Sequence, residues 1–341
     1  MRFLLTTDPG LEDVAAAEAR ERGFEASERP FGYAGLVLAE GEDEGELFSL
    51  RSVHHVVRHL GAFRLPLPTL EGAIAALGGI ELPELAEGKS FAVRVNRRGE
   101  HGFKSPELER ALGEVLVRRY RAPVRLEDPD VLLRVDLFDQ EALVGVQLTK
   151  KALSLRYPKV YAPMAALKTT VAYGMLRLVG AEEGALLDAF TGSGTIAIEA
   201  AQAFPGLSPV VGVDISTKAV AGAEENAKSA GVLDRVEFRR ADSRFLDRYF
   251  SPESFDFLLA NPPYGKRLGK REDLFGLYLK FMHSARRVLR PGGRLGLLVL
   301  KRGWVDRLLK IVGCFKVRHR RVIEVGGLYP GFFVLERDVC S

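Results

Sequence analysis

The chain has 341 residues, 47% of them hydrophobic, which is enough for two or three packed domains and excludes a disordered chain. Its charge is uneven: residues 1–88 carry 16 acidic and 7 basic side chains, whereas residues 89–341 carry 29 acidic and 42 basic ones. This basic part favours a polyanion such as a nucleic acid as partner, with scattered surface charge as the alternative. No stretch predicts a signal peptide or a membrane span, and the two cysteines give neither a disulfide framework nor a zinc spacing, so we expect a cytoplasmic protein.

The first 64 residues predict the order β-α-β-β-α-β, which is typical of a ferredoxin-like domain. The first strand is expected at Arg2–Thr7, and the last one in the stretch "HHVVRHLGAF". Between the first strand and the first helix, Asp8 can cap the helix and Pro9 can occupy its first position. This order of elements does not indicate a function by itself.

Residues 65–150 follow a proline-marked joint, "LPLPTL", and form the second predicted domain. The stretch "KSFAVRVNRR" predicts a basic strand, and the following helix is expected to be capped by Ser105 with Pro106 in its first position. Two alternating strands, Val131–Phe138 and Ala142–Thr149, complete this part. Residues 151–172 then form a basic linker.

From about Gly184 the chain repeats strand and helix, with strands expected at "ALLDAF", "PVVGVDI", "RVEFRRAD", "FDFLLAN" and "RLGLLVL". Four of these runs are almost entirely apolar, as in a parallel sheet covered on both faces. The stretches "VRHRRVIEV" and "FFVLER" predict a hairpin at the edge of the sheet.

Three acidic residues and a glycine turn fall at the ends of the first three of these strands. Asp188 ends the first strand and precedes Gly192 and Gly194, which let a ligand approach the start of a helix. Asp214 ends the second strand, where a carboxylate can bind ribose hydroxyls, and Asp242 ends the third, where it can accept an adenine amine. Ligands bind at this edge of such sheets, so the pattern predicts a nucleoside cofactor; a packed turn without a ligand is the alternative.

The fourth strand ends in "NPPYGKR", Asn261 to Arg267. An exocyclic amine of a base is a poor nucleophile because its lone pair is delocalised into the ring. The Asn261 amide oxygen and the Pro262 carbonyl could each accept one amine hydrogen and direct the lone pair, while Tyr264 stacks on the base. The expected electrophile is the methyl group of S-adenosylmethionine, and no metal is needed.

With these motifs in view, "DAFTGSGT", "GVDIS" and "NPPYGKR" resemble class I S-adenosylmethionine-dependent methyltransferases that act on amino groups. The stretch "VNRRGEHGFKSPELERALGEVL" resembles a THUMP domain, an RNA-binding module. The whole chain resembles bacterial and archaeal THUMP-containing tRNA (guanine-N2)-methyltransferases. This resemblance implies an α/β chain with a ferredoxin-like domain at 1–64, a THUMP domain at 65–150, a linker at 151–172 and a Rossmann-like methyltransferase domain with a seven-stranded sheet at 173–341.

The resemblance also implies the reaction and its residues. S-adenosylmethionine would methylate the N2 amine of an acceptor-stem guanosine, position 6 being expected, while the THUMP domain grips the tRNA 3′ end; the product cofactor is S-adenosylhomocysteine, and we expect a monomer. The implied catalytic residues are Asn261, Pro262 and Tyr264. The implied cofactor-binding residues are Asp188, Gly192, Gly194, Asp214, Ile215, Asp242, Ser243 and Asn261. The expected RNA-binding residues are Arg94, Arg97, Arg98, Lys104, Lys150, Lys151, Lys266 and Arg267.

Some positions depart from the family pattern or extend it. Thr191 stands where relatives often carry cysteine, and Tyr161 where histidine is common. The stretch Ala162–Thr170 resembles the family's helix that covers the cofactor. These departures bear on substrate details and leave the proposed chemistry intact.

Other functions share parts of this pattern. The same chemistry could act at another tRNA position or on ribosomal RNA. The "NPPY" motif also occurs in methyltransferases of DNA bases and of protein glutamine, although the THUMP-like segment argues against both. A non-catalytic RNA-binding scaffold is a further alternative, against which the intact acidic residues and "NPPY" argue.

Overall fold

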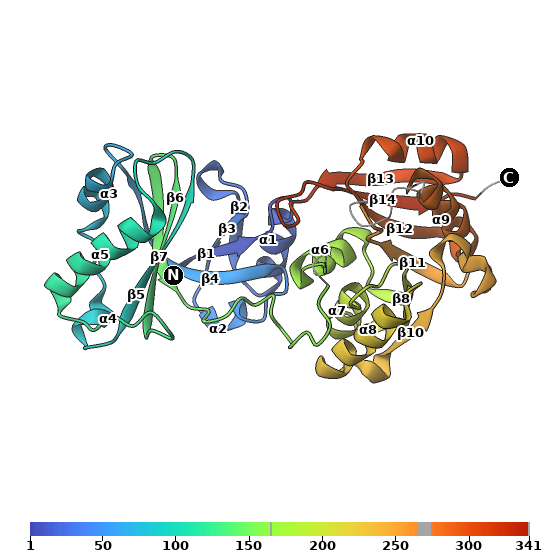
Figure 1. Ribbon diagram of the computed structural model, residues 1–341, viewed down its shortest axis with the longest axis horizontal. Helices are drawn as coiled ribbons and strands as arrows, with labels where there is room; N and C mark the ends of the chain where they lie inside the picture. Colours follow the sequence, from blue (N-terminus) through green and yellow to red (C-terminus); the bar gives the residue numbers. More distant parts are fainter. Residues whose placement is uncertain (164–165, 265–273, 340–341) are drawn as a thin grey trace. The chain divides into compact units, whose positions relative to one another are not determined.

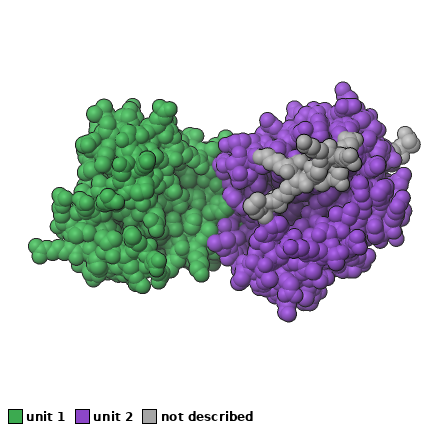
Figure 2. Space-filling model, in the orientation of Figure 1, with its two compact units in different colours: residues 1–7, 15–153 green, residues 8–14, 154–341 purple. Residues whose placement is uncertain are grey.

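The computed structural model describes residues 1–163, 166–264 and 274–339. The chain divides into two compact units, residues 1–7 with 15–153 and residues 8–14 with 154–341, shown in separate colours in Figure 2. In the described ranges no helix is both long and apolar enough to span a membrane.

Unit 1 is built on a single seven-stranded sheet with the strand order β2-β3-β1-β4-β7-β6-β5 (Figure 1). The strands are β1 (Arg2–Thr7), β2 (Glu25–Glu28), β3 (Leu36–Glu40), β4 (Val53–Arg64), β5 (Phe91–Arg98), β6 (Val131–Phe138) and β7 (Glu141–Gln147). The helices of this part of the chain are α1 (Glu12–Glu21), α2 (Glu44–Leu47), α3 (Leu70–Leu77), α4 (Pro83–Ala86) and α5 (Ser105–Tyr120). The β-α-β-β-α-β order expected for the first 64 residues is therefore present.

The long strand β4 makes the two predicted N-terminal parts share this sheet. Its first half pairs with β1, for example Val57 opposite Leu4, and its second half pairs with β7, for example Ala62 opposite Leu143. The predicted boundary after residue 64 thus falls at the end of a strand that belongs to both parts.

One face of the β5–β7 region is covered by α3, α4 and α5 (Figure 1). Leu108, Leu112 and Leu116 recur along α5 at helical spacing and pack in one core with Val93 and Val95 of β5. Because side chains alternate along a strand, Arg94, Asn96 and Arg98 start from the opposite face of β5, although Arg94 Nη1 still reaches Glu109 of α5 (3.9 Å).

Unit 2 contains a second seven-stranded sheet with the order β10-β9-β8-β11-β12-β14-β13. Its strands are β8 (Glu183–Asp188), β9 (Gly206–Asp214), β10 (Val236–Arg240), β11 (Phe255–Ala260), β12 (Leu289–Val299), β13 (Phe315–Val322) and β14 (Gly331–Arg337). Its helices are α6 (Thr169–Val179), α7 (Thr195–Ala203), α8 (Thr217–Ser229), α9 (Leu274–Val288) and α10 (Gly303–Val312). β8 to β12 are parallel, and β14 runs antiparallel between β12 and β13, so the predicted seven-stranded Rossmann-like sheet with an edge hairpin is confirmed.

Helices cover both faces of this sheet. Neighbouring residues of one strand enter different cores: Leu186 packs with α6, α7 and α8, whereas Leu187 packs with α9 and α10. Leu259 and Leu258 divide in the same way. Both faces are therefore apolar, which explains why these strands are continuous hydrophobic runs in the sequence.

Three local predictions are wrong. Asp8 does not cap α1, which begins at Glu12; its carboxylate instead accepts hydrogen bonds from Lys168 Nζ (2.7 Å) and Thr170 Oγ1 (2.5 Å). The described residues of the stretch 162–168 are not helical, because α6 begins only at Thr169. Ser105 is the first residue of α5 rather than its cap, and Glu107 accepts the backbone N–H of Lys104.

The cysteines also differ from the expectation. Cys314, which follows α10, is disulfide-bonded, although no disulfide framework was predicted from two cysteines. Cys340 lies outside the described residues.

Candidate active site

The glycine turn after β8 brings the backbone to the start of α7. Gly192 has φ +52° and Gly194 has φ +81°, a left-handed conformation that side chains disfavour. A Cβ atom on Gly194 would also meet Ala223 and Phe238 at 3.1 Å, whereas a Cβ atom on Gly192 would meet nothing closer than 4.0 Å. Gly194 is thus required for packing, and Gly192 leaves open space for a ligand.

A cavity of about 380 Å³ opens beside this turn at the carboxyl ends of the strands. Its wall contains six of the eight predicted cofactor-binding residues: Gly192, Asp214, Ile215, Asp242, Ser243 and Asn261. Asp188 and Gly194 do not line it. The strand ends therefore bring the glycine turn, two of the three acids and the asparagine together.

The carboxylate of Asp214 is held at the cavity wall by two backbone groups. Its Oδ2 accepts the N–H of Gly192 (3.1 Å), and its Oδ1 accepts the N–H of Ser216 (2.9 Å). The neighbouring Ile215 is 56% exposed although it is large and apolar. An acceptor beside an open apolar surface suits a ribose joined to a purine.

Asp242, the predicted acceptor of an adenine amine, is already paired. Arg244 Nε lies 3.0 Å from both of its carboxylate oxygens, and Nη2 lies 2.6 Å from Oδ2. These hydrogen bonds from Arg244 keep the pKa of Asp242 below its usual value. A base amine at this place has to share the carboxylate with Arg244 or displace it.

Asp188 lies behind the cavity wall instead of facing a ligand. Its side chain is fully buried, and its Oδ2 accepts the hydroxyl of Thr191 (2.8 Å). Burial, together with a smaller contribution from the nearby Asp214 carboxylate, raises the pKa of Asp188 to about 7. The predicted role in lining the cofactor thus becomes a role in supporting the glycine turn through Thr191.

The amide and ring of "NPPY" meet each other at the end of β11. Asn261 lines the cavity, and its Oδ1 accepts the hydroxyl of Tyr264 (2.7 Å). Burial raises the pKa of Tyr264 above its usual value, so the phenol stays protonated and donates. Pro262 is buried, and Pro263 joins Asn261 in the wall. Tyr264 does not line this cavity; it lines a neighbouring hollow together with Tyr278 and Trp304.

Three wall residues belong to the stretch Ala162–Thr170 that was expected to cover the cofactor: Pro163, Ala166 and Leu167. The other wall residues were not named as site residues; they are Phe190, Thr191, Ser193, Thr195, Ile196, Arg244, Pro263 and Leu277. Phe190, Thr191 and Ser193 could have been inferred from their place beside the glycines. Arg244 and Leu277 carry no comparable signal, because they reach the cavity only through the packing of the segment after β10 and of α9.

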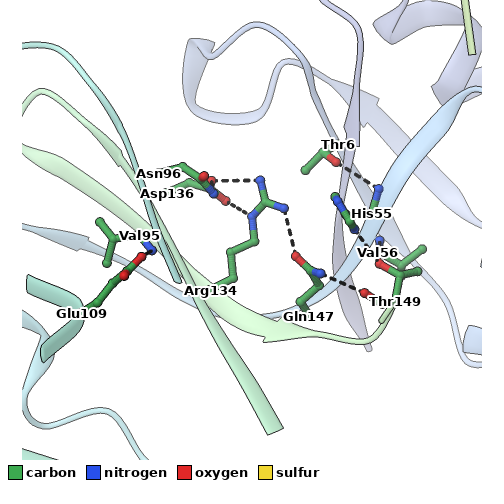
Figure 3. Close-up of polar contacts among 10 residues, drawn as sticks. All are labelled: Thr6, His55, Val56, Val95, Asn96, Glu109, Arg134, Asp136, Gln147 and Thr149. Atoms are coloured by element: carbon green, nitrogen blue, oxygen red, sulfur yellow. Dashed lines mark hydrogen bonds and ion pairs between the residues drawn. The ribbon is translucent and has the colours of Figure 1, made fainter. Parts of the chain in front are cut away.

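The open face of the unit 1 sheet carries a polar cluster (Figure 3). Arg134 Nε donates to Asp136 Oδ2 (2.8 Å), and its Nη1 donates to Gln147 Oε1 (3.1 Å). Asn96 donates to the other oxygen of Asp136 (2.8 Å), and His55 Nδ1 lies 3.0 Å from Thr149 Oγ1. These groups satisfy one another, so the cluster is a rigid polar floor.

A cavity of about 310 Å³ lies on this unit, beside that cluster. Arg97, Arg98 and Arg134 line it, together with Phe138. The Arg98 guanidinium lies 5.7 Å from the centre of the Phe138 ring. Cationic and aromatic groups together suit single-stranded nucleic acid.

The remaining predicted RNA-binding residues are dispersed. Arg94 and Lys104 are exposed, Lys150 pairs with Asp128 (2.6 Å), and Lys151 is exposed. Lys266 and Arg267 lie outside the described residues. Within the described ranges, no group of three or more histidine, cysteine, aspartate or glutamate side chains could hold a metal ion.

Two family comparisons match complementary parts of the chain. The family described as "RMKL-like, methyltransferase domain" matches residues 156–329, and the THUMP domain matches residues 80–147. The chain belongs to the THUMP-containing RMKL-like methyltransferases. The predicted family is thereby confirmed.

Individual relatives agree over nearly the whole chain. A tRNA (guanine(6)-N2)-methyltransferase of Thermus thermophilus is 44% identical over 97% of this chain and 98% of its own length. One of Archaeoglobus fulgidus is 30% identical over 98% and 92%. The solved structure of TrmN from Thermus thermophilus has 41% identity and a TM-score of 0.79, covering 98% of this chain and 99% of its own. A putative methyltransferase complexed with SAH, at 19% identity and a TM-score of 0.78, covers 100% of this chain and 99% of its own and shows the fold alone.

The buried carboxyl of Asp188 predicts a pH-dependent stability. In the unfolded chain this carboxyl ionises near pH 4, whereas its pKa in the folded protein is about 7. Its contribution to stability is therefore complete below pH 4 and is lost as the pH rises to 7. The Asp188→Asn side chain cannot ionise, so the variant does not lose this stability. The free energy of unfolding of Asp188→Asn minus that of the unsubstituted protein should therefore increase by on the order of 3 kcal/mol between pH 4 and pH 7. Urea unfolding of both proteins at pH 4.5 and at pH 8 measures this change. If the free energies of unfolding of the two proteins differ by the same amount at both pH values, the buried, protonated state of Asp188 is contradicted.

The contact between Asn261 and Tyr264 predicts a graded response to substitution. Tyr264→Phe keeps the ring beside Tyr278 and Trp304 and loses only a neutral hydrogen bond to Asn261, so kcat/KM should fall about two- to tenfold. Tyr264→Ala also removes the ring and should cost at least about a hundredfold. Steady-state methyl transfer measures both; a Phe variant as inactive as the Ala variant would show that the hydroxyl, and not the ring, is required.

Proposed function

We propose that this protein transfers a methyl group from S-adenosylmethionine to the N2 amine of guanosine 6 in the tRNA acceptor stem, giving N2-methylguanosine. The observation that carries the proposal is the shared cavity: the Asn261 amide opens onto the same space as Gly192 and Asp214. Relatives named tRNA (guanine(6)-N2)-methyltransferase, similar over nearly the full length, support the substrate.

The residues around the cavity fit S-adenosylmethionine. Asp214 would hold the ribose, Ile215 would contact the purine, and Asp242 and Ser243 would lie at the base. Gly192 leaves room for the remainder of the molecule beside the glycine turn. When bound, the cofactor supplies an electrophilic methyl group.

Asn261 and Pro262 would act on the guanine. The Asn261 oxygen accepts one hydrogen of the exocyclic amine and the Pro262 carbonyl accepts the other, which turns the nitrogen lone pair toward the cavity. The two prolines fix the backbone of this corner, so the acceptors need no reorganisation when the base enters. To stack on that base, the Tyr264 ring would have to leave the hollow that it shares with Tyr278.

A methyl-transfer assay tests the reaction and its residues together. Labelled S-adenosylmethionine and an unmodified tRNA should give N2-methylguanosine, and replacing guanosine 6 by adenosine should abolish it. Asn261→Ala should lower kcat at least about a hundredfold with cofactor affinity nearly unchanged, because it removes the acceptor for the guanine amine and leaves Asp214 and the glycine turn in place. Asp214→Ala should instead weaken cofactor binding about ten- to a hundredfold.

Other outcomes of this assay identify the alternatives. Label at another guanosine would keep the chemistry and change the position. Label in ribosomal RNA, DNA or a release-factor protein but not in tRNA would overturn the substrate. Cofactor binding without transfer to any of them would favour an RNA-binding scaffold.

We further propose that the arginine-lined cavity of unit 1 takes the single-stranded 3′ end of the tRNA. Arg98 offers a cation whose guanidinium plane is supported by the Phe138 ring, and the Arg134 cluster keeps the floor rigid (Figure 3). This role would use Arg98 of the predicted set directly, whereas the Arg97 side chain donates to Ser105 of α5 and lies over the Phe103 ring.

Shortened tRNA tests this assignment. Removing the last four nucleotides of the tRNA should weaken its binding to the unsubstituted protein about tenfold or more. Arg98→Ala should weaken the binding of full-length tRNA by a similar factor. The two losses should not add, because both remove the same contact. Arg118→Ala, a cation on α5 that is 79% exposed and pairs with Glu114, is the matched control and should change little. Fully additive losses would place the 3′ end elsewhere.

A further inference from the structure

One stripe of α8 faces the segment that leads to the cofactor cavity. Gly222, Asn226 and Ser229 are spaced four and three residues apart, so they lie on one side of the helix. All three contact residues 158–161, and the same segment continues to Pro163, which lines the cavity. The wall of the cavity is thus fastened to a helix that does not itself line it.

Asn226 joins this segment to the glycine turn. Its side chain is fully buried. Its Oδ1 accepts the backbone N–H of Tyr161 (3.0 Å), and its Nδ2 donates to the carbonyls of Tyr161 (2.7 Å) and Ser193 (2.9 Å). Ser193 lies between the two glycines of the turn and lines the cavity. The Asn226 amide therefore bonds to both the segment that contains Tyr161 and the glycine turn that contains Ser193.

Gly222 shows that the contact with Tyr161 is close. A Cβ atom added to Gly222 would lie 2.2 Å from Cγ of Tyr161 and 2.6 Å from its Cβ. The Tyr161 ring therefore rests directly on the α8 backbone, one turn before Asn226. Only glycine allows this approach.

Lys159 adds a second link between the same two walls. Its Nζ donates to the carbonyl of Leu167 (3.1 Å) and to Thr195 Oγ1 (3.2 Å), and both Leu167 and Thr195 line the cavity. The glycine turn with the start of α7 and the segment of residues 158–163 and 166–167 are thus connected at two points, through Asn226 and through Lys159.

We propose that Asn226 is a positioning residue for the cofactor: it holds the Tyr161 segment and the Ser193 peptide in the arrangement that S-adenosylmethionine requires. The inference rests on the proposed function, because it concerns the same cavity. Asn226 does not line the cavity, so it acts through Tyr161 and Ser193. Substitution of Asn226 should weaken cofactor binding and should not change the methyl-transfer step, in which Asn261 acts.

Calorimetric titration of the full chain with S-adenosylhomocysteine and S-adenosylmethionine tests the proposal. Asn226→Ala should raise both dissociation constants at least tenfold. The Asn226→Asp side chain has the same size and still accepts the N–H of Tyr161. Its second oxygen cannot donate to the carbonyls of Tyr161 and Ser193, so this variant should bind the cofactor as weakly as Asn226→Ala does. At saturating cofactor, kcat and the KM for tRNA should stay within about threefold of the values for the unsubstituted protein, while the KM for S-adenosylmethionine rises. A general loss of folded protein would instead lower kcat.

Two further variants separate this role from simple loss of stability. Gln202→Ala also removes an amide hydrogen bond between α7 and α8, to the Ala230 carbonyl (3.0 Å), but it lies away from the cavity and should leave cofactor affinity unchanged. Gly222→Ala improves the helix propensity of α8 and displaces Tyr161 without touching Asn226, so it should weaken cofactor binding at least fivefold in a folded protein.

The outcomes are distinguishable. If the unsubstituted chain binds neither cofactor, the proposed function fails and the inference fails with it. If it binds both and folded Asn226→Ala binds them equally well, the inference alone is overturned. If Gln202→Ala weakens cofactor binding as much as Asn226→Ala does, the effect is general loss of packing and the positioning role is likewise overturned. Should Asn226→Ala not fold, unchanged affinity in Gly222→Ala overturns the proposal.

Discussion

Parallel pairing of β8 with β9 and β11 is the constraint on which the site depends. It places Asp188 and Asp214, the last residues of β8 and β9, and Asn261, the residue after β11, at one edge of the sheet. The pairing itself is stabilised by leucines that alternate between two helix layers, such as Leu186 and Leu187. Core packing and the position of the chemical groups therefore have the same cause, since moving a strand by one residue would exchange its two buried faces.

Around this edge, polar side chains are held by the backbone more than by one another. Asp214 accepts two backbone N–H groups, and Asn226 bonds to three backbone groups. Such contacts fix loops that have little secondary structure of their own. Asp242 differs, because its carboxylate is neutralised mainly by the flexible side chain of Arg244. We therefore expect Asp242 to adapt most when a ligand binds.

Unit 1 uses one long strand to unite two parts that look separate in the sequence. β4 is 12 residues long and pairs with β1 and then with β7, so both parts contribute to one open face. On that face Arg134 and Asp136 come from β6, Asn96 from β5 and Gln147 from β7. The rigid floor beside the arginine-lined cavity exists only because these strands are in register.

The sequence by itself determined the strand order along the chain, the parallel sheet and much of the cavity wall, because apolar runs, glycines and strand-terminal acids are local signals. Gly192, Asp214, Ile215, Asp242, Ser243 and Asn261 all line this one cavity. The tertiary structure decided which polar groups face the cavity. Asp8 looked like a helix cap, but it bonds to Lys168 and Thr170, about 160 residues away. Asp188 is buried behind Thr191, and the Tyr264 hydroxyl bonds to Asn261. The Asp8 contacts depend on partners distant in sequence. The other two join residues only three positions apart, but they depend on how the surrounding strands and helices bury Asp188 and Tyr264, which no local pattern encodes.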